Sequence, residues 1–142
     1  MSVSEGYKGD ITPEEVWQTL GENEQAVLVD VRTAAEWKYV GVADISNLPS
    51  KSIYIEWVSF PGDKFNENFP RELSQAVPSH QTPLYFLCRS GVRSIGAAKL
   101  ATSMGYENCF NILEGLEGVF DEKGHRGTVS GWQARGFPWK YV

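Results

Sequence analysis

Three short, mostly apolar runs separated by segments with helical spacing limit the folds open to this chain of 142 residues. The runs cover residues 26–31, 84–87 and 109–113, and none alternates strictly between apolar and polar positions. Strands of this kind are buried on both faces, as in a parallel sheet covered by helices. Because helical segments lie between the runs, we expect an α/β fold: a mostly parallel central sheet with helices on both faces.

The helical segments carry start and stop signals. A helix over residues 11–23 has a threonine-led capping box completed by Glu15, and Pro13 suits its first turn. A helix over residues 93–104 is rich in small side chains, and Gly105 stands where a left-handed residue ends a helix. The other expected elements are short helices at 33–40 and 71–77, a strand at 53–60, and loops from Gly115 onward with a short helix near Trp132.

Length and composition point to a single domain over residues 1–142, with a core at about 12–118 and a glycine-rich C-terminal tail at 119–142. The chain is 42% hydrophobic and 22% charged, which is the ordinary globular range and excludes extensive disorder. The net charge of −5 argues against a nucleic-acid binder that depends on a basic surface.

No apolar run approaches the roughly 20 residues that a membrane-spanning helix needs, so we expect no membrane partner. The first ten residues lack the basic and apolar regions of a secretory leader, and we expect a cytoplasmic protein. Two cysteines and two histidines, far apart, form neither a disulfide scaffold nor zinc-ligand spacing, so no metal is expected. These four residues are Cys88, Cys109, His80 and His125.

The most informative segment runs from Cys88 to Ser94, where a buried strand ends, a short loop follows and a helix begins. Ligands bind beyond the carboxyl ends of parallel strands. Backbone N–H groups of such a loop lack internal acceptors, and the helix dipole adds positive potential. A thiol there ionises readily, and the thiolate is the nucleophile. Gly91 permits the tight turn, while Arg89 and Arg93 supply positive charge. The candidate residues of the loop are Arg89, Ser90, Gly91, Val92, Arg93 and Ser94.

Charge distribution supports a catalytic role for Cys88. No Asp or Glu occurs between Leu73 and Tyr106, although the chain as a whole is acidic, which indicates a site for an anion. The alternative is a buried structural cysteine, a common role for this residue type. We favour catalysis for Cys88 and the structural role for Cys109, which lies in an apolar strand.

Three segments, in order, resemble the single-domain rhodanese family. The loop CRSGVRS at 88–94 resembles its active-site loop. The stretch DVR at 30–32, followed by Glu-Trp at 36–37 and by Gly41, resembles an earlier signature, and GYENCFNILEG at 105–115 resembles a later one. The chain departs from the family where Val-Ala-Asp-Ile follows Gly41 and where the second glycine of the last signature is absent. The resemblance therefore implies a rhodanese-like domain and leaves the substrate open.

By this resemblance, Cys88 carries sulfur in a rhodanese-type thiosulfate sulfurtransferase. It attacks the outer sulfur of a small anionic donor such as thiosulfate, becomes a persulfide, and passes the sulfur to a thiol or to cyanide. The acceptor thiol could also belong to a protein. Arg89 is expected to face the mouth of the site and Arg93 to brace the loop or bind the anion. No metal or organic cofactor is implied.

Two further pairs have two interpretations each. Asp30 and Arg32 follow a buried strand and are candidates for supporting the loop; a structural Arg32–Glu36 pair at helical spacing is the interpretation we favour. His125 and Arg126, in a glycine-rich stretch, either rim the site or belong to a solvated loop.

Two other functions compete with sulfur transfer. Cysteine phosphatases and arsenate reductases need an arginine six positions after the cysteine, where this chain has Ser94, so its loop is one residue too short for them. A binding, regulatory or sulfur-relay module with little turnover of its own would form the same persulfide. Slow turnover of thiosulfate with cyanide, but fast transfer to a partner protein, would identify it.

Overall fold

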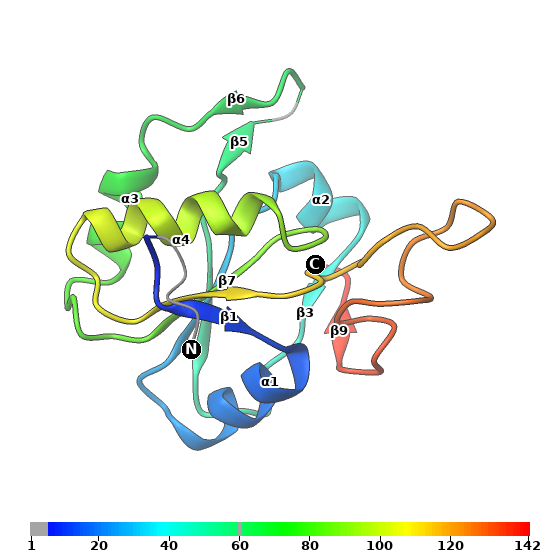
Figure 1. Ribbon diagram of the computed structural model, residues 1–142, viewed down its shortest axis with the longest axis horizontal. Helices are drawn as coiled ribbons and strands as arrows, with labels where there is room; N and C mark the ends of the chain where they lie inside the picture. The colour runs from blue at the N-terminus through cyan, green and yellow to red at the C-terminus, as the bar shows by residue number, and fades with distance from the viewer. Residues whose placement is uncertain (1–5, 60) are drawn as a thin grey trace.

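A computed structural model describes residues 6–59 and 61–142. The first five residues, part of the segment searched for a secretory leader, and Phe60 lie outside this range. The centre is a five-stranded, wholly parallel sheet with the strand order β1-β8-β7-β2-β4 (Figure 1). Its strands are β1 (Gly9–Ile11), β2 (Val27–Asp30), β4 (Lys51–Tyr54), β7 (Leu84–Leu87) and β8 (Cys109–Ile112). The expected α/β class with a parallel sheet is confirmed.

The remaining elements surround this sheet. The helices are α1 (Pro13–Glu22), α2 (Ala34–Tyr39), α3 (Phe69–Ala76) and α4 (Arg93–Ser103). Two short antiparallel pairs join β3 (Val42–Ala43) to β9 (Trp139–Lys140) and β5 (Val58–Ser59) to β6 (Lys64–Phe65). The β5–β6 hairpin projects from the body of the molecule in Figure 1.

Alternate side chains of β2 and β7 divide the core into two layers. Val29 and Phe86 pack in one layer with residues of α3 and α4. Leu28 and Leu87 pack in the other with residues of α1 and with Trp132 of the C-terminal segment. Helices therefore cover both faces of the sheet, as expected, and a strand with apolar residues at successive positions is buried on both sides.

The capping signals act as the sequence indicates. Thr12 and Glu15 form the complete capping box of α1. Thr33 and Glu36 form a second one at the start of α2. Gly105 follows α4 with φ of +107°, the left-handed conformation expected of a glycine at that position.

Two predictions about secondary structure are wrong. In place of the strand expected over 53–60, the structure has β4 and a separate β5. Tyr54 at the end of β4 pairs with the last residue of β2, and β4 stops there because its partner strand stops. The end of the expected strand, Phe60, lies outside the described residues. The helix expected near Trp132 is a series of turns, because Gly131 and Gly136 adopt φ of +99° and +82° and a right-handed helix cannot contain them.

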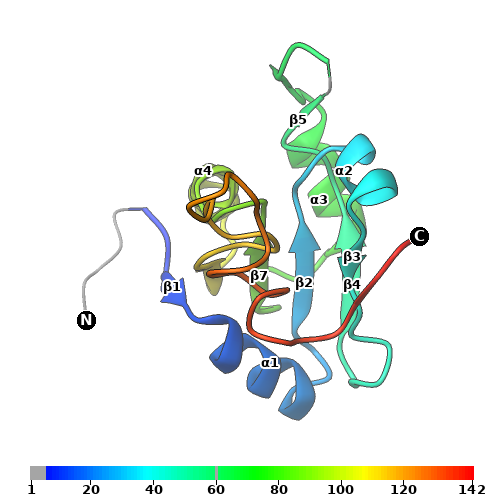
Figure 2. The same cartoon turned by 90° about the vertical axis from the view of Figure 1, so that its right-hand side faces the viewer.

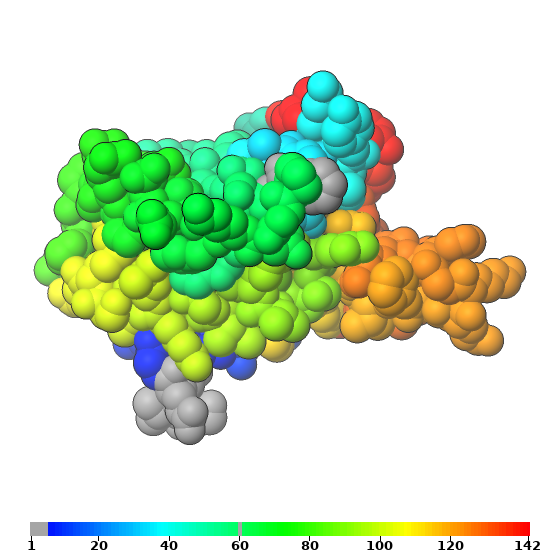
Figure 3. All heavy atoms as spheres, turned by 90° about the horizontal axis from the view of Figure 1, so that it is seen from above, coloured from blue at the N-terminus to red at the C-terminus, as the bar shows by residue number. Residues whose placement is uncertain are grey.

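The carboxyl ends of the parallel strands meet at one end of the molecule. In Figure 2 the arrowhead of β2 points to this end, where α2 and the β5–β6 hairpin lie. Figure 3 looks down on it and shows the segment around residues 119–130, in orange, projecting from the body. In the described parts of the chain, no helix has the length and apolar content needed to cross a bilayer. Within these same ranges, no three His, Cys, Asp or Glu side chains are grouped so that they could hold a metal ion.

Candidate active site

Cys88 directly follows β7 and is only 1% exposed. The Gly91 N–H donates a hydrogen bond to its Sγ atom over 3.1 Å. The Ser94 Oγ atom also lies 3.1 Å from Sγ, at the first turn of α4. Gly91 has φ of +100°, so the turn that aims its N–H at the sulfur favours glycine.

A cavity of about 850 Å³ opens beside Cys88. Its walls come from the 88–93 loop, α2, the β5–β6 hairpin and the segment that follows β8. The charged residues in the walls are three arginines and three acids: Arg89, Arg93, Arg126, Glu36, Asp63 and Glu117. The interval without acids around Cys88 in the sequence thus does not produce a site without acids, because other elements bring carboxylates to it.

Arg93 is held by Glu36. Its two terminal nitrogens donate to the two carboxylate oxygens of Glu36 over 2.9 and 2.8 Å. Burial acts to raise the pKa of Glu36, but hydrogen bonds from Arg93 and from the Thr33 N–H outweigh it and hold that pKa below its usual value. Burial acts to lower the pKa of Arg93, and Glu36 raises it overall. Arg93 therefore braces the loop against α2.

The favoured pairing of Arg32 with Glu36 is wrong. Arg32 instead forms a buried ion pair with Asp30, with 2.8 Å between Nη2 and Oδ2, and donates to the Gly41 carbonyl over 2.7 Å. The capping box turns Glu36 back toward Thr33, where it meets Arg93 rather than Arg32. Asp30 and Arg32 fix the chain after β2 to the end of α2, and neither lines the cavity.

The other two arginines of the cavity are held in different ways. The side chain of Arg89 is 43% exposed, and its Nε atom lies 3.6 Å from a Glu117 oxygen. Arg126 donates to the Gly118 carbonyl over 2.6 Å and stacks over the ring of Phe120 at 3.9 Å from its centroid. His125, by contrast, is exposed and is not among the residues that line the cavity.

The segment after β8 packs behind the 88–94 loop and holds it by hydrogen bonds. The N–H groups of Leu116 and Glu117 donate to the carbonyls of Cys88 and Arg89 over 2.9 Å each. A Cβ atom at Gly115 would lie 2.5 Å from both carbonyl oxygens. The requirement for glycine is visible in the sequence, but its contact with a loop 26 positions earlier is not.

A buried polar network lies behind the sulfur. Ser94 is fully buried and donates a hydrogen bond to the side-chain oxygen of Asn111, which is 1% exposed. The Asn111 amide in turn donates to Asp10 over 3.1 Å and to the Gly91 carbonyl over 3.3 Å. Ser94 was expected at the site, whereas Asn111 and Asp10 were not, since β8 and β1 bring them there.

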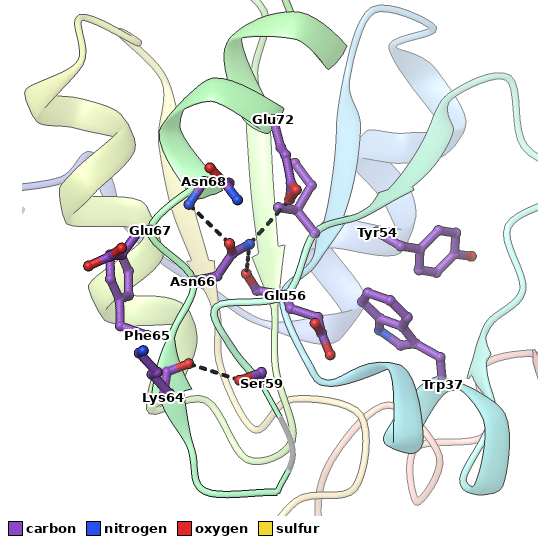
Figure 4. A pocket seen from close by; sticks show the side chains of 11 residues that line it. Trp37, Tyr54, Glu56, Ser59, Lys64, Phe65, Asn66, Glu67, Asn68 and Glu72 are labelled. Carbon is purple, nitrogen blue, oxygen red and sulfur yellow. Dashed lines mark hydrogen bonds between the residues drawn. The ribbon is translucent and has the colours of Figure 1, made fainter.

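A second cavity of about 420 Å³ lies on the other side of the β5–β6 hairpin (Figure 4). Trp37 and Tyr54 stand together on one side, and Asn66 forms hydrogen bonds with Glu56 and Glu72 on the other. No cysteine contributes to its walls. The candidate nucleophile Cys88 lines the larger cavity, and residues of the hairpin line both cavities.

Comparison with known proteins agrees with this geometry. The family described as the STR4 middle domain matches residues 9–141. The chain belongs to this family of rhodanese-like domains. A crystal structure of the Mycobacterium tuberculosis protein Rv0390 is 48% identical to the domain, with a TM-score of 0.88, and covers 96% of this chain and 99% of that one.

Curated relatives of the rhodanese-like domain include proteins with and without a described activity. An uncharacterized protein of Rickettsia conorii is 36% identical over 132 residues, which is 93% of this chain and 97% of that protein. The mitochondrial thiosulfate sulfurtransferase RDL2 of Saccharomyces cerevisiae is 32% identical over 114 residues, covering 80% of this chain and 64% of the yeast protein. The domain thus belongs to the sulfurtransferase superfamily.

Proposed function

We propose that this rhodanese-like domain is a sulfurtransferase in which Cys88 carries a sulfane sulfur as a persulfide. The observation that supports it most is the position of the Cys88 Sγ atom. This atom accepts a hydrogen bond from the Gly91 N–H and borders a cavity that Arg89 and Arg126 also line. The relation to a thiosulfate sulfurtransferase of yeast supports the choice of thiosulfate as the first donor to test.

The reaction divides into two displacements. The Cys88 thiolate attacks the outer sulfur of thiosulfate, a new S–S bond forms, and the old S–S bond breaks as sulfite leaves with its electron pair. Cyanide or a thiolate then attacks the outer sulfur of the persulfide, and Cys88 leaves as a thiolate, ready for the next donor. The Cys88 Sγ atom carries negative charge as the attacking thiolate and again as the leaving thiolate, and in both states the Gly91 N–H can donate to it.

The arginines have different parts in this proposal. The charge of Arg93 is balanced by Glu36, so its part is to hold the loop. The side chain of Arg89 is 43% exposed and has only a long contact with Glu117, so it is free to receive an anionic donor. Arg126 borders the same cavity and adds a second positive charge.

The experiment is an intact-mass measurement of the protein after incubation with thiosulfate. A mass gain of about one sulfur atom, reversed by cyanide, is expected for the wild type and for Cys109→Ala, and no gain for Cys88→Ala. A gain that persists in Cys88→Ala, or no gain in the wild type with thiosulfate or polysulfide, would refute the proposal. Persulfide formation without turnover on cyanide would indicate the sulfur-relay function.

A further inference from the structure

In the polar network behind Cys88, the donor and the acceptor of each hydrogen bond can be assigned. The Asn111 side-chain nitrogen has two hydrogens, one for the Asp10 carboxylate at 3.1 Å and one for the Gly91 carbonyl at 3.3 Å. Both partners are acceptors without a hydrogen to give. The amide oxygen of Asn111 must therefore be the atom that faces Ser94. Asp10 and Asn111 are also directly paired in the register of β1 and β8, which fixes their relative position.

This assignment determines which hydrogen lies between Ser94 and Cys88. A serine hydroxyl has one hydrogen, and here it is donated to the Asn111 oxygen. Ser94 thus offers only a lone pair to the Cys88 Sγ atom 3.1 Å away. That contact is a hydrogen bond only when the cysteine supplies the hydrogen, so this orientation of the hydroxyl suits the thiol form of Cys88 better than the thiolate.

We propose that Asn111 is a positioning residue that sets the direction of the Ser94 hydroxyl, and that Ser94 turns its hydrogen from Asn111 to Cys88 when the sulfur becomes a thiolate. The S–H proton leaves to water in the cavity, while the Ser94 hydrogen stays on its own oxygen and only rotates. The resting thiol is thereby stabilised, and ionisation costs the hydrogen bond between Ser94 and Asn111. This inference rests on the proposed role of Cys88 as nucleophile.

Other charged groups also influence the ionisation of Cys88, so a test of Asn111 must compare variants in which these groups are unchanged. They come from the loop, α2, the hairpin and the segment after β8: Arg89, Arg93, Glu36, Asp63, Glu117 and Arg126. None of them forms a hydrogen bond with the side chains of Ser94 or Asn111 among the bonds of the described residues. Substitutions at Asn111 therefore change the direction of the network while leaving these charges in place.

The decisive variant is Asn111→Leu, a change of similar volume that removes the acceptor. Ser94 then has no partner except Cys88 and donates to the thiolate at no cost. We expect the pH midpoint of the reaction of Cys88 with iodoacetamide to fall, and the rate below the midpoint to rise roughly three- to tenfold, the effect of one hydrogen bond. The rate is followed by peptide mass spectrometry, and folding is checked by far-UV circular dichroism.

The matched control is the same substitution in a Ser94→Ala background. If Asn111 acts through the hydroxyl, Asn111→Leu shifts the midpoint only when Ser94 is present. A shift of equal size in both backgrounds would mean a general loosening of the loop and would overturn the proposal, as would an unchanged or higher midpoint in folded Asn111→Leu.

A second variant protects the test against a failure of Asn111→Leu to fold. Asp10 is exposed, and Asp10→Asn places a group there that can donate to Asn111 and let its amide turn over. We expect a smaller fall of the midpoint, and an unchanged midpoint would contradict the proposal. No sulfur donor is used, so these results are readable even if thiosulfate proves to be the wrong substrate.

Discussion

The two cysteines lie at opposite ends of α4 and are both buried in the same apolar layer, but their polar surroundings differ. Cys88 precedes the helix and is 1% exposed, and Cys109 follows it and is fully buried. Cys88 receives the Gly91 N–H and borders a cavity. The Cys109 Sγ atom donates a long hydrogen bond, 3.8 Å, to the Tyr106 carbonyl oxygen, and burial raises the pKa of Cys109 to about 11.

The difference follows from the direction of the chain in a parallel sheet. The end of a strand leads to the start of a helix, with its free N–H groups, and the end of that helix leads back to the start of the next strand. One helix therefore presents opposite ends of its dipole to the two sulfurs. Fractional exposure therefore does not distinguish the two cysteines, whereas their positions at opposite ends of the parallel strands do.

The largest expected effect is in alkylation, which tests the comparison directly. At pH 8 a thiol with a pKa of about 11 is ionised to roughly one part in a thousand. Iodoacetamide should therefore modify Cys88 at least about 100-fold faster than Cys109 in the folded protein. Peptide mass spectrometry separates the two sites, and urea-unfolded protein is the control in which both react. Similar rates in the folded state would break the comparison.

Substitutions at two glycines test how strongly the loop at Cys88 depends on the segment after β8. Gly115 and Gly124 have φ of +64° and +77°, so alanine is strained at both. Only at Gly115 would the new Cβ atom meet backbone, whereas at Gly124 nothing lies within 4 Å. We expect Gly115→Ala to cost at least about 2 kcal/mol more than Gly124→Ala. Because it displaces the loop, it should also slow sulfur loading roughly tenfold.

Urea unfolding gives the stability of both variants, and the rate of mass gain with thiosulfate gives their activity. Equal losses of unfolding free energy in the two variants would mean that the loop can move away from the segment after β8 without penalty.

The smallest expected effect concerns Glu36→Gln. The folded-state pKa of Glu36 lies below its ordinary value of 4.5, so its ionised form adds stability that is complete above pH 4.5 and is lost as the pH falls through the folded-state value. We expect the variant to be about 1 kcal/mol less stable than the wild type at pH 7, with a smaller difference at pH 3. Urea titrations at both pH values measure this, with Glu24→Gln on the surface as control. A difference that grows at pH 3 would have the wrong sign.

Much of the fold could be predicted because the central strands are buried on both sides and the helices carry their caps. The missed strands are two or three residues long and have no periodicity of their own. β9, for example, exists because Trp139 and Lys140 reach β3, almost 100 positions earlier. The strand expected to continue to residue 60 ends where its partner β2 ends. The local sequence gives no information about the length of a partner strand.

The loop around Cys88 could be predicted because all its parts are contiguous. Its supports could not, because each comes from elsewhere in the chain. Glu36 shares helical spacing with Arg32, and only the fold shows that it meets Arg93 instead. In the sequence, Asn111 is a single polar residue in an apolar strand, and its hydrogen-bond partner Asp10 lies 101 positions away.

Trp132 has a consequence for the order of events during synthesis. Its indole is fully buried against the layer that contains Val16 and Leu20 of α1, and its N–H donates to the Pro138 carbonyl. A ribosome delivers α1 and all five strands of the sheet before it delivers this tryptophan. A nascent chain that ends before Trp132 therefore holds all five strands of the sheet while one apolar layer lacks its tryptophan, and this layer can be completed only after Trp132 has left the ribosome.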